Sequence, residues 1–363
     1  MATLTIHPQC DQLAWQQAFF ISLDHPSGKK EIGKEERSSP NSINDDLGCP
    51  VWANDKFDIS LFQKSLSAHH KTRVIAVAKR VFEDKLPELA EAKDLFIGFT
   101  GSDGREEKLN PHASPVEIVV GMKSKESLKS GALEKIRTLI AQHPDLFYKD
   151  IEVKCLETDA LMTFKGEKDE RPFPTRALDA RYLVGNEETF IAYRKAFFKE
   201  LQQPASSKAL AKFKKNAVQD TYRVFKRTVE GVDKSQIDLF TGNVSYDGNR
   251  IKGVKYPYLR PVQYKLAMHV FSLIQNNKIS EADFFQMPSP TIERIQWLAD
   301  KKLIKATAEE IRSFQKAYIA SMVWFSISQK RFEVFKQPEI SLPVRELKGV
   351  AEAIAQFCNR LAA

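Results

Sequence analysis

The feature that most constrains the fold is a change of hydrophobic period between residues 94 and 157. Residues 94–100 and 116–122 are short apolar runs, and residues 151–157 alternate apolar with polar side chains. Runs of this length, rich in β-branched and aromatic residues, predict strands. Residues 127–141 instead carry apolar side chains at helical spacing. The order of these elements predicts a small mixed sheet flanked by helices.

Helical spacing dominates on both sides of these strands. It predicts a helix that starts at Ile59 and ends before Pro87, and it predicts only helices after Pro174. Thr307 and Glu310 have the spacing of a capping box at the start of the longest of these. The expected fold class is therefore α+β, a small mixed β-sheet domain followed by an all-α domain. The helices expected after Pro174 are residues 176–201, 207–229, 258–275, 291–301, 307–336 and 343–361.

Three segments follow from this pattern. Residues 1–56 are expected to hold a helix over 13–23 and then a loop-rich stretch, because residues 24–56 are rich in Ser, Asn, Asp, Gly and Pro. Residues 57–170 form the predicted α/β domain, and residues 171–363 form the predicted helical domain.

Composition excludes several classes of protein. No run of about 18 apolar residues occurs, and the N-terminus lacks the pattern of a signal peptide, so we expect no membrane span. The four cysteines are far apart and form no CxxC pair, which predicts reduced thiols and a cytoplasmic protein. The net charge of +8 suits an anionic ligand such as a nucleotide or a nucleic acid.

The most informative motif is the turn between the first two predicted strands. It reads Gly101-Ser102-Asp-Gly104-Arg105-Glu-Glu107. Two glycines let the backbone approach a ligand closely, and backbone N–H groups with the Ser102 hydroxyl can hold a phosphate. The Arg105 guanidinium offers bidentate hydrogen bonds to phosphate or carboxylate. The alternative is an ordinary glycine turn with solvated charges.

This motif resembles that of the polymerase-β-like nucleotidyltransferases. It is most similar to the bacterial branch that contains the signal-protein uridylyltransferases. Residues 176–190, with an Asp-x-Arg followed by Gly-Asn, resemble a second motif of that branch. Residues 249–252 and 259–263, Asn-Arg-Ile-Lys and Leu-Arg-Pro-Val-Gln, resemble a third. The three motifs occur in the family's order, and the resemblance covers about residues 58–335.

The resemblance implies a nucleoside triphosphate (NTP) as substrate or ligand and Mg²⁺ as cofactor. In that family an Asp-x-Asp pair on the second strand and a third carboxylate on a later strand hold two Mg²⁺ ions, which suits the preference of Mg²⁺ for oxygen ligands. The implied nucleotide-binding residues here are Gly101, Ser102, Gly104, Arg105, Glu107, Lys252 and Arg260.

The chain departs from the family at the Asp-x-Asp pair. Residues 112–117 read His-Ala-Ser-Pro-Val-Glu. Alignment on the following strand puts Pro115 and Glu117 at the two acids, whereas an ungapped alignment puts Ala113 and Pro115 there. The expected metal ligands are therefore Glu117, with Glu157 or Asp159 as the third carboxylate, and at least one ligand is missing. Glu117 can also be an ordinary exposed strand residue.

Two functions follow. The first is transfer of a nucleoside monophosphate from an NTP to a protein, nucleic-acid or small-molecule acceptor, with Glu117 and Asp159 as catalytic residues. The alternative is a catalytically degenerate module that binds a nucleotide or a protein partner. In either case we expect Lys252 and Arg260 to lie within side-chain reach of Ser102 and Arg105, rather than on an outer face.

Overall fold

The computed structural model describes most of the chain between residues 56 and 361. The helix expected over 13–23 and the loop expected over 24–56 lie outside the described residues. The described residues are 12, 16, 56–109, 115–124, 126, 131–149, 151–157, 159, 173–204, 206–215, 229–230, 237–238, 243–244, 250–252, 258–329 and 341–361.

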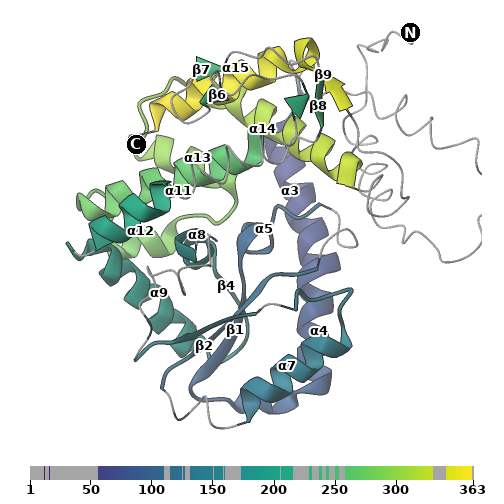
Figure 1. Cartoon of the computed structure of the whole chain (residues 1–363), viewed down its shortest axis with the longest axis vertical. Coiled ribbons are helices and arrows are strands. Elements are labelled where there is room, and N and C mark those ends of the chain that lie inside the picture. The colour runs from purple at the N-terminus through teal and green to yellow at the C-terminus, as the bar shows by residue number, and fades with distance from the viewer. Residues whose placement is uncertain are drawn as a thin grey trace, which may run out of the picture.

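A four-stranded mixed sheet lies at the centre of the first half of the chain (Figure 1). The three predicted strands are confirmed as β1 (Leu95–Phe99), β2 (Ile118–Met122) and β3 (Glu152–Cys155). The strand order is β3-β2-β1-β4, with β1 antiparallel to both neighbours and β2 parallel to β3. The prediction of a small mixed sheet is therefore confirmed.

The fourth strand, β4 (Arg181–Gly185), lies where the sequence predicted a single helix over 176–201. That prediction is wrong in its first half, since α8 (Phe173–Leu178) ends before β4 and α9 (Glu187–Gln202) begins after it. Pairing with β1 decides the conformation, because it buries Leu183 and Val184. Gly185 has a φ of 99° at the end of the strand, and the Asn186 side chain then caps α9.

Alternate side chains of β1 and β2 point to two separate cores. Leu95, Ile97 and Phe99 pack with α7 (Ala132–Gln142) and with α4 (Ala76–Lys85), which cover one face of the sheet (Figure 1). The helix predicted from Ile59 to before Pro87 is confirmed. It runs from α3 (Ile59–His70) through a π-helical turn at Lys71–Ile75 into α4.

The opposite face of the sheet packs against α9, which in turn contacts α11 and α12 (Figure 1). Phe96 and Val119 contribute to this larger core from the sheet, while Tyr193 and Phe197 contribute from α9. The remaining helices are α11 (Arg260–Gln275), α12 (Glu281–Gln286), α13 (Thr291–Asp300), α14 (Ala308–Gln329) and α15 (Val344–Arg360), with a further helix at residues 206–215.

The sequence predicted an all-α C-terminal half, and this prediction is wrong in part. The C-terminal half is mostly helical. It also contains very short strands, which are too short to give a period in the sequence. The capping box before α14 is confirmed, since Thr307 and Glu310 exchange hydrogen bonds of 2.7 and 3.1 Å. The short strands are β5 (Val229–Glu230), β6 (Ile237–Asp238), β7 (Asn243–Val244), β8 (Arg250–Lys252) and β9 (Ser341–Pro343). Within the described ranges, no helix has the length and apolar content needed to cross a bilayer.

The register of β1 and β2 can be tested at Gly121, which lies opposite Phe96. A Cβ atom on Gly121 would lie 2.0 Å from the Phe96 ring. We expect Gly121→Ala to lower the free energy of unfolding by about 1–3 kcal/mol through overpacking, measured by urea denaturation. In a Phe96→Leu background the same substitution should cost clearly less, because the ring is gone. Equal costs in both backgrounds would contradict this packing.

Candidate functional site

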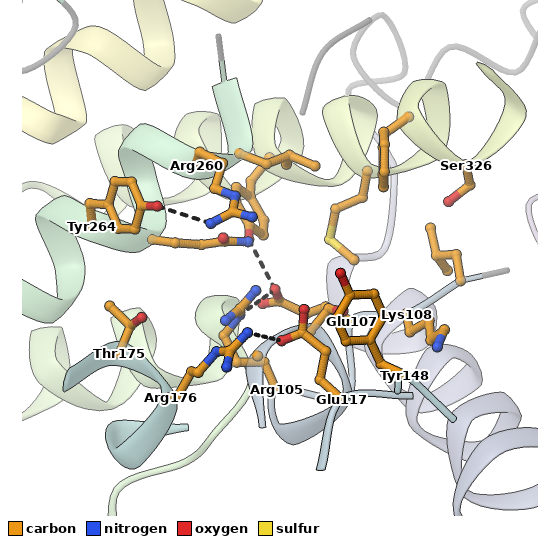
Figure 2. A pocket seen from close by; sticks show the side chains of 18 residues that line it. Arg105, Glu107, Lys108, Glu117, Tyr148, Thr175, Arg176, Arg260, Tyr264 and Ser326 are labelled. Carbon is orange, nitrogen blue, oxygen red and sulfur yellow. Dashed lines mark hydrogen bonds and ion pairs between the residues drawn. The ribbon is translucent and has the colours of Figure 1, made fainter. Parts of the chain in front are cut away.

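A pocket of about 290 Å³ lies between the sheet and the C-terminal helices (Figure 2). Its walls come from α5 (Gly101–Gly104) and the chain after it, from the residue before β2, and from the loop after α7. The other side is formed by α8, α11 and α14. Segments far apart in the sequence therefore meet around a single space.

Six of the predicted site residues line this pocket: Gly101, Ser102, Arg105, Glu107, Glu117 and Arg260. Gly101 has a φ of 61°, and a Cβ atom on it would lie 2.7 Å from the Glu117 carboxylate. The turn therefore needs glycine both for its backbone conformation and for the close approach of Glu117. Arg260 comes from α11 and reaches the same space as Ser102 and Arg105, as expected.

Gly104, Glu157 and Asp159 are not among the residues that line the pocket. A Cβ atom on Gly104 would lie 1.9 Å from the Asp179 carbonyl oxygen, so this glycine allows close backbone packing. Glu157 is exposed after β3, and Asp159 accepts a hydrogen bond of 3.0 Å from the Cys155 N–H. The Lys252 side chain lies outside the described part of the structure.

Arg105 and Glu107 are buried and paired with protein groups, which the sequence did not predict. The Arg105 guanidinium donates to Asp179 at 2.5 Å and to Glu107 at 2.8 Å. Burial alone lowers the pKa of Arg105, but the charges of Asp179 and Glu107 outweigh it and raise that pKa above its ordinary value. Arg105 and Glu107 therefore line the pocket as an ion pair with each other and with Asp179, and their binding of a nucleotide stays a prediction.

The same two carboxylates connect the sheet to the C-terminal helices. Asp179 also accepts a hydrogen bond of 3.0 Å from Arg294 of α13. Glu107 accepts from the Thr291 N–H at 2.8 Å and from the Tyr318 hydroxyl at 3.1 Å. We name Arg105, Glu107, Asp179 and Arg294 the interdomain ion network, because it joins residues more than 70 positions apart.

A second carboxylate lies near Glu117, and the sequence analysis missed it. Glu152 of β3 pairs with Val119 of β2, and Glu117 lies two residues before Val119, so the two acids share one face of the sheet. Arg176 of α8 reaches both carboxylates, with N–O distances of 3.5 Å to Glu117 and 3.8 Å to Glu152 (Figure 2 shows the first). The alternating pattern of residues 151–157 could have located Glu152, but only with the register of β3.

These donors do not match a site for two Mg²⁺ ions. Glu117 lines the pocket and shares Arg176 with Glu152, which is buried and is not among the lining residues, and Pro115 has no side-chain oxygen to act as the first acid. Within the described residues, no group of three or more His, Cys, Asp or Glu side chains is placed to hold a metal ion. The role of Mg²⁺ thus remains a prediction of the resemblance.

The pocket is nevertheless rich in cations. Four cationic side chains, Arg105, Lys108, Arg176 and Arg260, line it together with the two carboxylates of Glu107 and Glu117. Aromatic rings from Tyr148 and Tyr264 also face this space. Arg260 donates a hydrogen bond of 2.9 Å to the Tyr264 hydroxyl (Figure 2). Lys108 and Tyr148 were not predicted, since no local motif marks them, and Arg176, which begins the second motif of the resemblance, was not predicted as a site residue.

No protein-family model matches the chain, and no curated protein has a significantly similar sequence. The resemblance to the nucleotidyltransferases therefore stays a prediction based on three short motifs.

The interdomain ion network can be tested at Asp179. Asp179→Asn removes a buried charge that serves two arginines, so we expect a loss of about 3 kcal/mol in the free energy of unfolding. Glu134 is the matched control, because its pair with Arg137 is exposed, and Glu134→Gln should cost less than about 1 kcal/mol. Urea denaturation measures both. Equal effects of the two substitutions would show that the network does not stabilise the fold.

Proposed function

We propose that this protein binds a nucleoside triphosphate in the pocket. The observation that carries the proposal is the excess of cationic side chains beside the Gly101-Ser102 turn. Phosphate groups are bound by guanidinium groups and by backbone N–H groups of such turns. The resemblance of the turn to the nucleotidyltransferase motif supports the same ligand.

The polyphosphate is expected to contact Arg260 and Arg176. Arg105 is held by Asp179 and Glu107, so it contributes charge but less hydrogen bonding. Arg260 donates one hydrogen bond to Tyr264, and a guanidinium has five N–H donors, which leaves it able to bind phosphate oxygens as well. The Arg176 side chain is only 14% exposed, and limited contact with water strengthens its charge interactions.

The base is expected to stack on Tyr148. This ring is 38% exposed and lies on the pocket wall opposite α11 and α14 (Figure 2). Exposed aromatic rings provide stacking platforms for nucleobases, since every base has a π-face. A cationic side together with an aromatic side fits a nucleotide better than it fits inorganic phosphate.

Transfer of a nucleoside monophosphate is the second candidate. Glu117 and Glu152 support it, because they share a face of neighbouring strands, and in the resembling family acids of the second strand and of a later strand hold the metal ions. Both acids are paired with Arg176, however, so we place nucleotide binding in a regulatory or scaffold role first. Incubation with each labelled NTP, Mg²⁺ or Mn²⁺ and cell lysate tests transfer. Label incorporation that is lost in Glu117→Gln would favour the enzyme.

Arg260 provides the direct test of binding. Arg260→Gln should weaken binding of ATP, UTP, GTP or CTP at least tenfold, or about 1.4 kcal/mol, in titration calorimetry. Arg137→Gln is the control, because this arginine is exposed on α7 and is not among the pocket residues. The proposal fails if the unaltered protein binds none of the four nucleotides, or if both variants bind them equally well.

Tyr148 separates recognition of the base from recognition of phosphate. Tyr148→Ala should weaken nucleotide binding by about 1–3 kcal/mol, the usual contribution of stacking, but should leave binding of inorganic triphosphate unchanged. Tyr182→Ala is the control, since Tyr182 has a similar exposure, 36%, and lies on β4 outside the pocket. Calorimetry with both ligands measures the difference. Parallel losses for the two ligands would place the base elsewhere.

A further inference from the structure

Arg176 occupies an unusual position between two carboxylates. Its guanidinium lies 3.5 Å from Glu117 and 3.8 Å from Glu152, and its side chain is only 14% exposed. Glu152 is itself buried, with 4% of its side chain exposed. The pair of acids and the cation therefore form a compact group, which lies on the sheet side of the pocket.

The group lies directly beside the expected phosphate site. The Glu117 carboxylate is in contact distance of Gly101, which begins the Gly-Ser turn. A carboxylate there repels a bound phosphate unless a cation is placed between or beside them. In a metal-dependent site, a divalent ion that contacts acids and phosphate performs this role.

We propose that Arg176 takes the place of that divalent cation, so that the pocket binds free nucleoside triphosphate without metal. The inference rests on the proposed function and specifies its ligand. The Arg176 guanidinium has five N–H donors in a planar fork, so it can pair with both acids and also donate to a phosphate oxygen. The presence of Pro115 just before β2 is consistent with this arrangement, because proline has no side-chain oxygen that could bind a metal ion.

The charge balance gives a clear expectation for Arg176→Gln. Without the guanidinium, Glu117 loses the cation beside it, while Glu152 keeps its pair with Lys154 at 3.8 Å, so the negative charge beside the phosphate site increases. Binding of ATP in EDTA should then fall at least tenfold, and added Mg²⁺ or Mn²⁺ should recover part of it by taking the vacated position. Arg176→Lys keeps the charge and should lose less. Arg137→Gln should behave as the unaltered protein does.

The substitution Glu117→Gln is expected to change ATP affinity in opposite directions for the two roles proposed for this acid. If Arg176 replaces the metal, removal of the Glu117 charge frees the guanidinium for phosphate and strengthens ATP binding in EDTA. If Glu117 is a metal ligand, the same substitution weakens binding measured with Mg²⁺ and has little effect in EDTA.

The experiment is titration calorimetry of the full chain with ATP, in EDTA and in Mg²⁺. Mn²⁺ binding without nucleotide is measured in parallel by electron paramagnetic resonance. We expect equal affinity of the unaltered protein in EDTA and Mg²⁺, and Mn²⁺ binding only in Arg176→Gln. Binding that requires Mg²⁺ in the unaltered protein overturns the inference but leaves the proposed function intact. Absence of binding to each of the four NTPs under both conditions overturns the proposed function itself. Circular dichroism of each variant confirms that it is folded.

Discussion

The interdomain ion network is the interaction on which the rest of the structure depends. The side chains of Glu107 and Asp179 are only 6% and 4% exposed, and removal of a carboxylate from water costs several kcal/mol unless cations and donors replace the water. Arg105 and Arg294 supply the cations, while Thr291 and Tyr318 supply further donors. Because these groups come from both halves of the chain, the acids are satisfied only when the sheet and the C-terminal helices are in this arrangement.

The pocket is a consequence of that arrangement. Once α13 and α14 are held against the chain that follows α5, α11 presents Arg260 and Tyr264 opposite Ser102. Arg105 and Glu107 of the network line the pocket. The ion pairs of Arg105 stabilise the fold, and its charge also contributes to the electrostatic potential of the pocket. A motif arginine can thus be essential without being the group that binds a ligand, and its neighbours on other elements then carry the contacts.

The proposed role of Arg176 follows from the charges of Glu117 and Glu152, which a single guanidinium contacts. Two acids on one face of parallel strands need a positive partner, and either a metal ion or a guanidinium can neutralise them. A side chain is covalently part of the chain, so its local concentration does not depend on the metal supply. The cost is geometric, since one planar cation cannot contact attacking and leaving oxygens as two ions can.

Local pattern determined much of the fold. Residues 94–100, 116–122 and 151–157 were predictable as strands, and the Thr307 capping box was predictable as a helix start, because period and capping depend on residues near in sequence. The turn at Gly101-Ser102, which lines the pocket, was predictable for the same reason. Tertiary structure alone decided that residues 181–185 pair as β4, that Glu152 rather than Glu157 or Asp159 joins Glu117, and that Arg105 is held by Asp179. Each of these depends on contacts between residues tens of positions apart, which leave no periodic trace in a single sequence.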